Sequence, residues 1–249
     1  MAKAQVRTSD LSRRNQTNVQ LRNELLLRIP RNERASIWPN LEFVRLKGHQ
    51  VLHQAGEPLK SGYFCNSGVF SVLSEMPNGN VVEVALIGKE GFAGIPLVSG
   101  FHTSAATVIV QVEATAFRVD ASHLKAMFRQ SPSLEYELHR YSQLLTLQIM
   151  QTSTCNRFCE VHRRLARWLL MTHDRCEDGS SFPITQDFLA YMLGTRRSSI
   201  SLAAGILQKK KMISYARGEV TILNRSTLEN AACDCYEALR EQIRDWQGN

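Results

Sequence analysis

The sequence contains no run of about 18 apolar residues, the length that a helix needs to cross a bilayer. Its first residues, 1–16, are polar and lack the apolar core of a secretory signal. We therefore expect a cytoplasmic protein without a membrane segment. In a cytoplasmic chain of 249 residues, the six cysteines are expected to be thiols and not a disulfide framework.

Motifs for catalysis are also missing. The sequence has no nucleophile elbow, no Gly-rich phosphate-binding loop followed by Lys, and no zinc-protease motif. The His-x-His motif of a cupin-type metal enzyme, with its later Glu and His, is absent as well. We therefore expect neither an enzyme nor a bound cofactor.

The composition is that of a globular protein with a moderate positive charge. Hydrophobic residues make up 43% of the chain and charged residues 21%, and the formal net charge is +7. A chain of this length forms one large domain or two smaller ones. The positive charge favours a polyanionic partner without establishing one.

The first half of the chain changes from helical to strand-like sequence. Residues 1–20 form a polar lead, and two short helices are expected after it, from Val19 to Pro30 and from there to near Pro39. From Leu41 to about Val119, short runs rich in Val, Phe, Ile and Thr are separated by Gly, Asn and Pro. This pattern predicts an all-β sandwich or barrel. The Asn-Gly within residues 75–84 is the strongest hairpin signal.

A long helical segment follows the strands. Residues 133–173 contain no Gly or Pro, and the helical period produces one stripe there: Leu134, Leu138, Tyr141, Leu145, Gln148 and Thr152. Such a stripe packs against a core or forms the seam of a dimer, and both alternatives stay open. Residues 163–174 are interpreted as a further helix.

Residues 184–223 carry the most informative pattern. Thr185 suits the N-cap of a first helix, and Gly194 suits the turn that ends it. A second helix follows, with an apolar side formed by Ile200, Ala203, Ala204 and Leu207. The next residues, 212–223, predict a β-hairpin with Gly218 at its tip. Helix, turn, helix and hairpin together make a winged helix-turn-helix.

Small and basic residues gather at the start of that second helix. In a helix-turn-helix this end enters the major groove, where serine permits a close approach and arginine can bind guanine with two hydrogen bonds. Lysines and a wing arginine suit phosphate contacts. The candidate DNA-binding residues are Arg196, Arg197, Ser198, Ser199, Ser201, Lys209, Lys210 and Arg217. The alternative is an ordinary helical hairpin with a solvated basic face.

The order of these parts resembles the catabolite activator and fumarate-nitrate regulator (Crp-Fnr) family of transcription factors. The resemblance covers about residues 20–225 and is most specific in "ITQDFLAYMLGTRRSSISLAAGILQKKKMIS". Further matching segments are "HQVLHQAGEPLKSGYFCNSGVFSVL", "LIGKEGFAGI" and "EVHRRLARWLL". It implies an α+β fold: an N-terminal cyclic-nucleotide-binding-like β-barrel (a double-stranded β-helix or jelly roll), a long dimerisation helix and a C-terminal winged helix-turn-helix.

The resemblance also implies an organisation and partners. We expect a polar lead at 1–20, an effector domain at 21–130, a dimerisation helix at 131–160, and a DNA-binding domain with a C-terminal tail at 161–249. A homodimer of this kind places two recognition helices in successive major grooves of pseudo-palindromic double-stranded DNA. RNA polymerase is a further candidate partner.

The effector pocket departs from the cyclic AMP-binding members of the family. Those members use a Glu for the ribose and an Arg for the cyclic phosphate, where this sequence has Gly91-Phe92 and about Ser104 (or His102). The long helix carries Ile149 and Met150 where base-contacting hydroxyls are expected. We expect an unknown small-molecule effector, or none, and not cyclic AMP. The pocket candidates are Gly91, Phe92, Gly94, Thr103 and Ser104, with Phe92 alternatively packed in the core.

The cysteines leave two alternatives. Iron-sulfur members carry an N-terminal cysteine cluster, whereas the first cysteine here is Cys65 in a predicted strand. Cys155, Cys159 and His162, at i, i+4 and i+7, would share one helix face and are candidates for zinc or a redox switch. They are otherwise small buried hydrophobes and a surface histidine. No fourth ligand is evident, and Cys233 and Cys235 have no assigned role.

Two rival functions therefore stand beside the DNA-binding regulator. One is a ligand-binding module whose winged helix binds protein and not DNA. The other is a metal- or redox-responsive sensor that uses Cys155, Cys159 and His162.

Overall fold

The computed structural model describes residues 19–176 and 181–248, so the expected polar lead lies almost wholly outside the described residues. The N-terminal part contains α2 (Glu24–Arg28), α3 (Arg31–Ile37), a 3₁₀ turn (Trp38–Asn40), β1 (Leu41–Leu46), β2 (Val51–His53), β3 (Ser61–Glu75), β4 (Val81–Ile87), β5 (Phe92–Ala93), α4 (Ile95–Val98), β6 (Thr107–Asp120) and α5 (Ala121–Gln130). The remainder contains α6 (Pro132–Phe158), α7 (Val161–His173), β7 (Ser181–Pro183), α8 (Gln186–Met192), α9 (Arg197–Lys209), β8 (Ile213–Ala216), β9 (Glu219–Ile222), α10 (Arg225–Ala231) and α11 (Cys235–Gly248).

The strand-rich segment forms the expected β domain, and all of its strands belong to one antiparallel sheet. Its main order is β1-β6-β3-β4, with β2 added to β6 and β5 added to β3. The two long strands, β3 and β6, pair along most of their length but shift register between Cys65 and Phe70. Because bulges increase the local bend and twist, these shifts let one end of the sheet pair with β1 and β5 and the other with β4. The predicted hairpin joins β3 to β4, with Gly79 at φ 83° in its turn.

The first helix is shorter than the sequence predicts. It begins at Glu24 and not at Val19, because the side chain of Asn23 caps it by accepting a hydrogen bond from the Leu26 amide at 3.1 Å. The Asn23 amide also donates to the carbonyl oxygens of Cys65 and Gly91 at 2.7 and 2.9 Å. A buried polar side chain therefore fixes the entry of the chain to the sheet.

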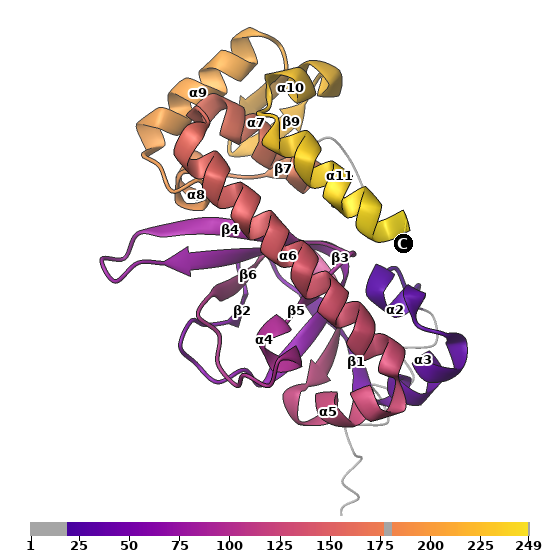
Figure 1. Cartoon of the computed structure of the whole chain (residues 1–249). Coiled ribbons are helices and arrows are strands. Elements are labelled where there is room, and N and C mark those ends of the chain that lie inside the picture. The colour runs from indigo at the N-terminus through magenta and orange to yellow at the C-terminus, as the bar shows by residue number, and fades with distance from the viewer. Residues whose placement is uncertain (1–18, 177–180, 249) are drawn as a thin grey trace, which may run out of the picture.

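Helix α6 runs along the molecule from the sheet domain to the C-terminal domain (Figure 1). Its buried side matches most of the predicted stripe, with Leu134, Leu138 and Tyr141 in the core of the sheet domain. The stripe therefore serves the core of its own chain. The helix ends at Phe158, and Cys159 has the extended backbone φ −97°, ψ 143°, before α7 begins at Val161.

The C-terminal domain is a winged helix-turn-helix, and its core also includes side chains of the sheet domain, among them Leu73 and Leu86. Helices α7, α8 and α9 pack together, and β7, β9 and β8 form a small antiparallel sheet beside them. The four residues expected on the apolar side of the second helix are all buried: Ile200, Ala203, Ala204 and Leu207. The predicted hairpin is β8–β9, with positive φ at Arg217 and Gly218.

The C-terminal segment is not a free tail of the DNA-binding domain. Helix α11 lies beside α6 and runs back toward α2 (Figure 1). Trp246 is buried in the core of the sheet domain, with the Arg28 guanidinium 4.4 Å from the centre of its ring. Gln247 donates to the Glu24 carboxylate at 2.9 Å. The chain end therefore connects both domains, and the division at residues 130 and 160 stays a prediction.

Buried polar contacts join the two domains directly. The Trp168 indole donates to Glu83 of β4 at 2.8 Å, and Gln111 of β6 donates to the Thr172 hydroxyl at 2.9 Å. Arg175, just after α7, forms an ion pair with Glu90 at 2.7 Å, and both side chains are buried. Among the described residues, no helix is both long and apolar enough to cross a membrane.

Candidate nucleic-acid interface

The helix-turn-helix is built by local sequence features. The hydroxyl of Thr185 accepts a hydrogen bond from the Phe188 amide at 3.2 Å and caps α8. Gly194 adopts φ 56°, a left-handed conformation that glycine enters without steric cost, and turns the chain toward α9. The Tyr215 hydroxyl donates to the Ile184 carbonyl at 2.8 Å and joins the wing to this unit. Burial raises the pKa of Tyr215 to about 12, so the hydroxyl keeps its proton as a donor.

One side of α9 is open to solvent along its whole length. The buried residues occupy the other side, because both sets recur with the helical period. The exposed side carries Arg197, Ser198, Ser201, Leu202, Gly205 and Gln208. Leu202 is 70% exposed, and nothing lies within 4 Å of the position that a Cβ at Gly205 would take. This side can therefore approach another surface closely without displacing a neighbour.

The structure brings the N-terminal candidate residues together. Arg196 is the N-cap of α9, and Arg197, Ser198 and Ser199 form its first turn. The Arg197 guanidinium lies 3.4 Å from the Asp187 carboxylate, and both side chains are largely exposed, so this ion pair contributes little stability and can open.

Residue Gln186 is a neighbour of this surface that the sequence pattern did not indicate. Its side-chain carbonyl accepts from the Ser201 hydroxyl at 2.5 Å. The pair joins the first turn of α8 to α9 and orients a hydroxyl on the open side of α9.

The remaining basic candidates lie apart from that end. Lys209 and Lys210 are at the C-terminus of α9, about 20 Å along the helix axis from Arg196 at 1.5 Å per residue. Arg217 is exposed at the tip of the wing, at φ 53°. The candidates therefore form one group at the N-terminal end of α9 and two outlying groups, at the C-terminus of α9 and at the tip of the wing.

A groove separates the recognition helix from the sheet domain. It has a volume of about 1010 Å³, with the hairpin residues 79–82 on one wall and Tyr191, Arg196 and Ser199 on the other. At its base, a Cβ on Gly194 would lie 3.0 Å from a methyl group of Val82. Movement of the β3–β4 hairpin would therefore act directly on the turn that aims α9.

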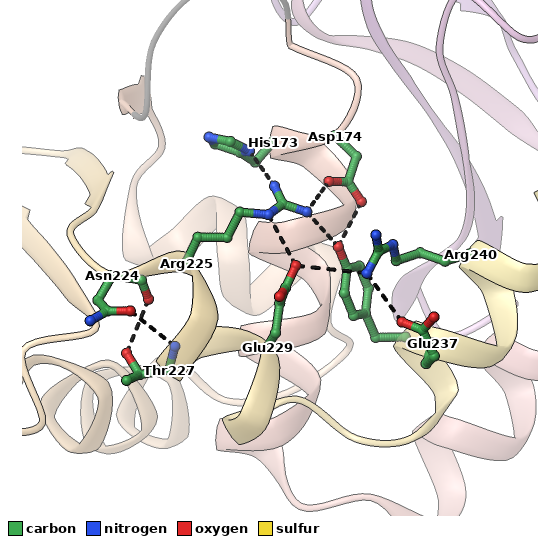
Figure 2. A network of polar contacts seen from close by, with 9 residues as sticks. His173, Asp174, Asn224, Arg225, Thr227, Glu229, Glu237 and Arg240 are labelled. Atoms are coloured by element: carbon green, nitrogen blue, oxygen red, sulfur yellow. Dashed lines mark hydrogen bonds and ion pairs between the residues drawn. The ribbon is translucent and has the colours of Figure 1, made fainter.

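An ionic network holds the end of the winged helix to α11. Figure 2 shows the Arg225 guanidinium between Asp174 at the end of α7 and Glu229 on α10, with N–O distances of 2.5 and 3.0 Å. The same arginine donates to the Tyr236 hydroxyl at 2.7 Å, which itself donates to Asp174 at 2.9 Å. Burial raises the pKa of Tyr236, so its hydroxyl stays a donor here.

The effector-pocket candidates do not gather around an open anion site. Phe92 is completely buried, and its ring centre lies 4.5 Å from that of Phe64. A Cβ on Gly62 would meet the Phe92 ring at 2.1 Å, and one on Gly91 would meet the Tyr141 hydroxyl at 2.2 Å, so aromatic rings fill this space. Thr103 is exposed and bridges Pro58.

The other two pocket candidates have structural partners. The Ser104 hydroxyl is satisfied by the backbone of Ala106 at 2.9 and 3.1 Å. Gly94, at φ 131°, is the N-cap of α4.

The structure groups the cysteines differently from the arrangement that the sequence predicted. Cys155 and Cys159 are close together, but α6 ends at Phe158, before Cys159, and His162 belongs to α7, so the expected single helix face is wrong. His162 instead faces Glu160, 3.2 Å away. Cys233 and Cys235 join Cys155 and Cys159 to form one group. In the sequence, only the Cys-x-Cys spacing of Cys233 and Cys235 pointed to this group of four, because about 75 residues of chain separate the two pairs. None of the six cysteines, all of which the structure describes, is in a disulfide bond.

The two domains and the open side of α9 define the class: a DNA-binding regulator with a separate effector-type domain. A model of the Crp-like helix-turn-helix domain matches residues 163–231, and a model of the cyclic nucleotide-binding domain matches residues 43–131. Together they cover more than half of the sequence. The chain belongs to the Crp/Fnr family of transcription regulators.

Solved structures have the same fold. A Crp/Fnr-family protein from Eubacterium rectale is 16% identical with a TM-score of 0.66, over 84% of this chain and 98% of that one. FixK2 from Bradyrhizobium japonicum is 13% identical with a TM-score of 0.65, over 78% and 98%. The c-di-GMP-responsive regulator CLP from Xanthomonas campestris is 15% identical with a TM-score of 0.61, over 76% and 97%. No curated protein matches the sequence significantly.

Proposed function

We propose that the chain is a cytoplasmic, homodimeric transcription regulator that reads pseudo-palindromic DNA in response to an unidentified effector. The observation that carries the proposal is the open side of α9, where two arginines and small hydroxyl side chains begin a helix in a Crp-like helix-turn-helix. Such an end is narrow enough to enter the major groove and supplies hydrogen-bond donors for base edges.

Each part of this surface receives a role. Arg197, Ser198 and Ser201 contact bases, and Arg196 and Ser199 contact bases or the adjoining backbone. Leu202, beside them, suits a thymine methyl group. The phosphate contacts come from Lys209, Lys210 and Arg217, which lie at the ends of the surface.

Helix α6 supports the proposed dimer. Four large apolar side chains stay exposed on it, Tyr136, Leu147, Met150 and Phe158, and the last is 78% exposed. At 100° per residue they fall within about 80° of arc on the side away from the sheet. A second copy of α6 would cover this stripe. Met150→Glu is expected to convert the dimer to a monomer in light scattering, whereas Met76→Glu, an equally exposed methionine on the hairpin, should not. A dimer that survives Met150→Glu would contradict this interface.

Cyclic AMP is not the effector in this proposal. The Phe92 ring occupies the space beside Gly62, and the Ser104 hydroxyl is already bonded to its own loop. Neither offers a cation for a cyclic phosphate. Titration calorimetry with cyclic AMP is expected to give no saturable heat, and saturable binding would refute this assignment. An effector that moves the β3–β4 hairpin would shift the population of α9 orientations through Val82 and Gly194.

The central test is selection of bound duplexes from a random DNA pool at about 0.1 M salt, since phosphate contacts weaken steeply as salt rises. A two-fold symmetric motif with half-sites about one helical turn apart is expected. If no DNA is enriched with or without small-molecule extract from the source cells, the rival function holds, in which the winged helix binds protein. Recruitment of RNA polymerase would be tested next on the selected site.

Two substitutions distinguish base contacts, which set sequence preference, from phosphate contacts, which do not. Arg197→Ala is expected to cost about 1–3 kcal/mol and to relax sequence preference at one position of each half-site. Lys210→Ala should weaken all sequences alike and reduce the salt slope by about one. Lys125→Ala removes the same charge from an exposed site on α5 and is the matched control. Unchanged affinity and preference in Arg197→Ala would refute the base-reading role.

A further inference from the structure

Four cysteine side chains from two distant segments converge beside the junction of α6 and α7. Cys155 lies in the last turn of α6, and Cys159 directly follows that helix. Cys233 lies in the turn between α10 and α11, and Cys235 is the first residue of α11. All four sulfur atoms lie within 4.8 Å of one another. Three of the side chains are buried and Cys159 is partly buried.

The spacing of the sulfur atoms suits one metal ion. Zinc binds thiolates at about 2.3 Å in a tetrahedron, which separates neighbouring sulfur atoms by about 3.8 Å. The Cys155–Cys233 and Cys159–Cys235 sulfur distances are 3.3 and 3.9 Å. A disulfide needs about 2.05 Å. An iron-sulfur cluster places iron and inorganic sulfide between its thiolates and so requires wider spacing than this group has.

A buried cation provides a second, independent indication. Arg167 of α7 is only 3% exposed, and within the described ranges no carboxylate lies within ion-pair distance of it. One of its terminal nitrogens contacts the Thr152 hydroxyl and the Met171 sulfur at 3.5 and 3.3 Å, and its Nε has no partner there. Thr152 and Cys155 are neighbours at i and i+3 on the buried side of α6, so the guanidinium lies beside the cysteine group. A buried guanidinium without an ion pair is costly unless anions compensate its charge. The Glu83 carboxylate also interacts with Arg167, but burial raises the pKa of Glu83 to about 7, so it is only partly ionised at neutral pH. Four thiolates with one dication carry a net charge of −2.

The Cys-x-Cys turn is held in place by other contacts. The Arg163 guanidinium donates to the Ala232 carbonyl at 3.2 Å and lies 3.5 Å from the Asp234 carboxylate. On the α11 side of the turn, the Tyr236 hydroxyl accepts a hydrogen bond from Arg225 at 2.7 Å. The turn is therefore oriented toward α6 by contacts that do not involve the thiols.

The geometry points to a single zinc ion bound by Cys155, Cys159, Cys233 and Cys235 as a tetrathiolate site. The thiols release their protons to solvent on binding, and no oxidation takes place. Each pair comes from a different segment, so the ion would fasten the end of the long helix to the α10–α11 turn. It would fix α11 and the DNA-binding domain relative to α6. This inference goes beyond the proposed function and stands whether or not the chain binds DNA.

The test is metal analysis of the full-length protein, purified anaerobically without chelator from zinc-supplemented cells. We expect about one zinc per chain, with zinc–sulfur distances of about 2.3 Å and four sulfur neighbours by X-ray absorption. Cys233→Ser is expected to lower the zinc content at least tenfold. The matched controls are Cys65→Ser and Cys176→Ser, which remove cysteines outside the group. Circular dichroism establishes that each variant is folded.

A second measurement uses the unmodified protein, so its result does not depend on whether the variants fold. Zinc-stripped protein titrated with Co²⁺ should develop the absorption of a tetrahedral thiolate complex, saturating at about one equivalent. Iron with inorganic sulfide in the purified protein would overturn the proposal. So would a Cys155–Cys233 or Cys159–Cys235 disulfide under anaerobic conditions, or zinc that Cys233→Ser retains. DNA selection is measured separately, so failure of the zinc site and failure of the DNA-binding proposal are distinguishable.

Discussion

Glu83 is a buried acid at the contact between the two domains, and its replacement by glutamine should change how stability depends on pH. The side chain is 7% exposed, and one carboxylate oxygen accepts the Trp168 hydrogen bond at 2.8 Å while the other has no partner among the described residues. Burial raises the pKa of Glu83 from 4.5 to about 7. Ser71, Arg167, Trp168 and Arg175 act in the opposite direction and do not offset the burial.

The sign of the effect follows from proton linkage. Because the folded state holds the proton more tightly than the unfolded state, Glu83 contributes most stability below pH 4.5 and loses that contribution as pH rises through about 7. A shift of about 2.5 units at 1.36 kcal/mol each amounts to about 3 kcal/mol. Glu83→Gln keeps an acceptor for Trp168 and cannot ionise. Its stability relative to the unmodified protein should therefore increase by about 3 kcal/mol between pH 4.5 and 8.5.

Urea denaturation of both proteins across this pH range measures the difference directly, and the contributions of all other titrating groups cancel. Glu113→Gln is the matched control. Glu113 is exposed on β6, so its charged form carries no cost of burial that the substitution could remove. A stability difference between Glu83→Gln and the unmodified protein that stays constant with pH would refute the reasoning. It would mean that the neighbouring arginines keep Glu83 ionised in the folded protein.

Two further substitutions test other parts of the structure. Arg175→Met leaves the Glu90 carboxylate buried without its ion-pair partner and should cost about 3–5 kcal/mol in urea denaturation; a loss below 1 kcal/mol would show that solvent reaches this pair. Gly194→Ala forces a side chain into φ 56° and places its Cβ 3.0 Å from Val82. We expect it to cost about 1–2 kcal/mol, measured by thermal unfolding, and unchanged stability would contradict the strained turn.

Local sequence determined the elements of both domains. The N-cap at Thr185, the turn at Gly194 and the apolar period from Ile200 to Leu207 are all properties of neighbouring residues. The same is true of the Asn-Gly hairpin and the alternating strands. Propensities and periodicities act over a few residues, so a single sequence is sufficient to predict such elements and, with a family resemblance, their order.

Only the tertiary structure decided what those elements face. Periodicity identified the apolar stripe of α6 but not whether the sheet or a second chain covers it. The structure assigns Leu138 and its stripe to the core of the chain, and it exposes Met150, which the predicted stripe did not include. Likewise, Cys155 and Cys233 are 78 residues apart, and their sulfur atoms meet only because α11 folds back along α6. Contacts of this range depend on how whole elements pack, which no local propensity encodes.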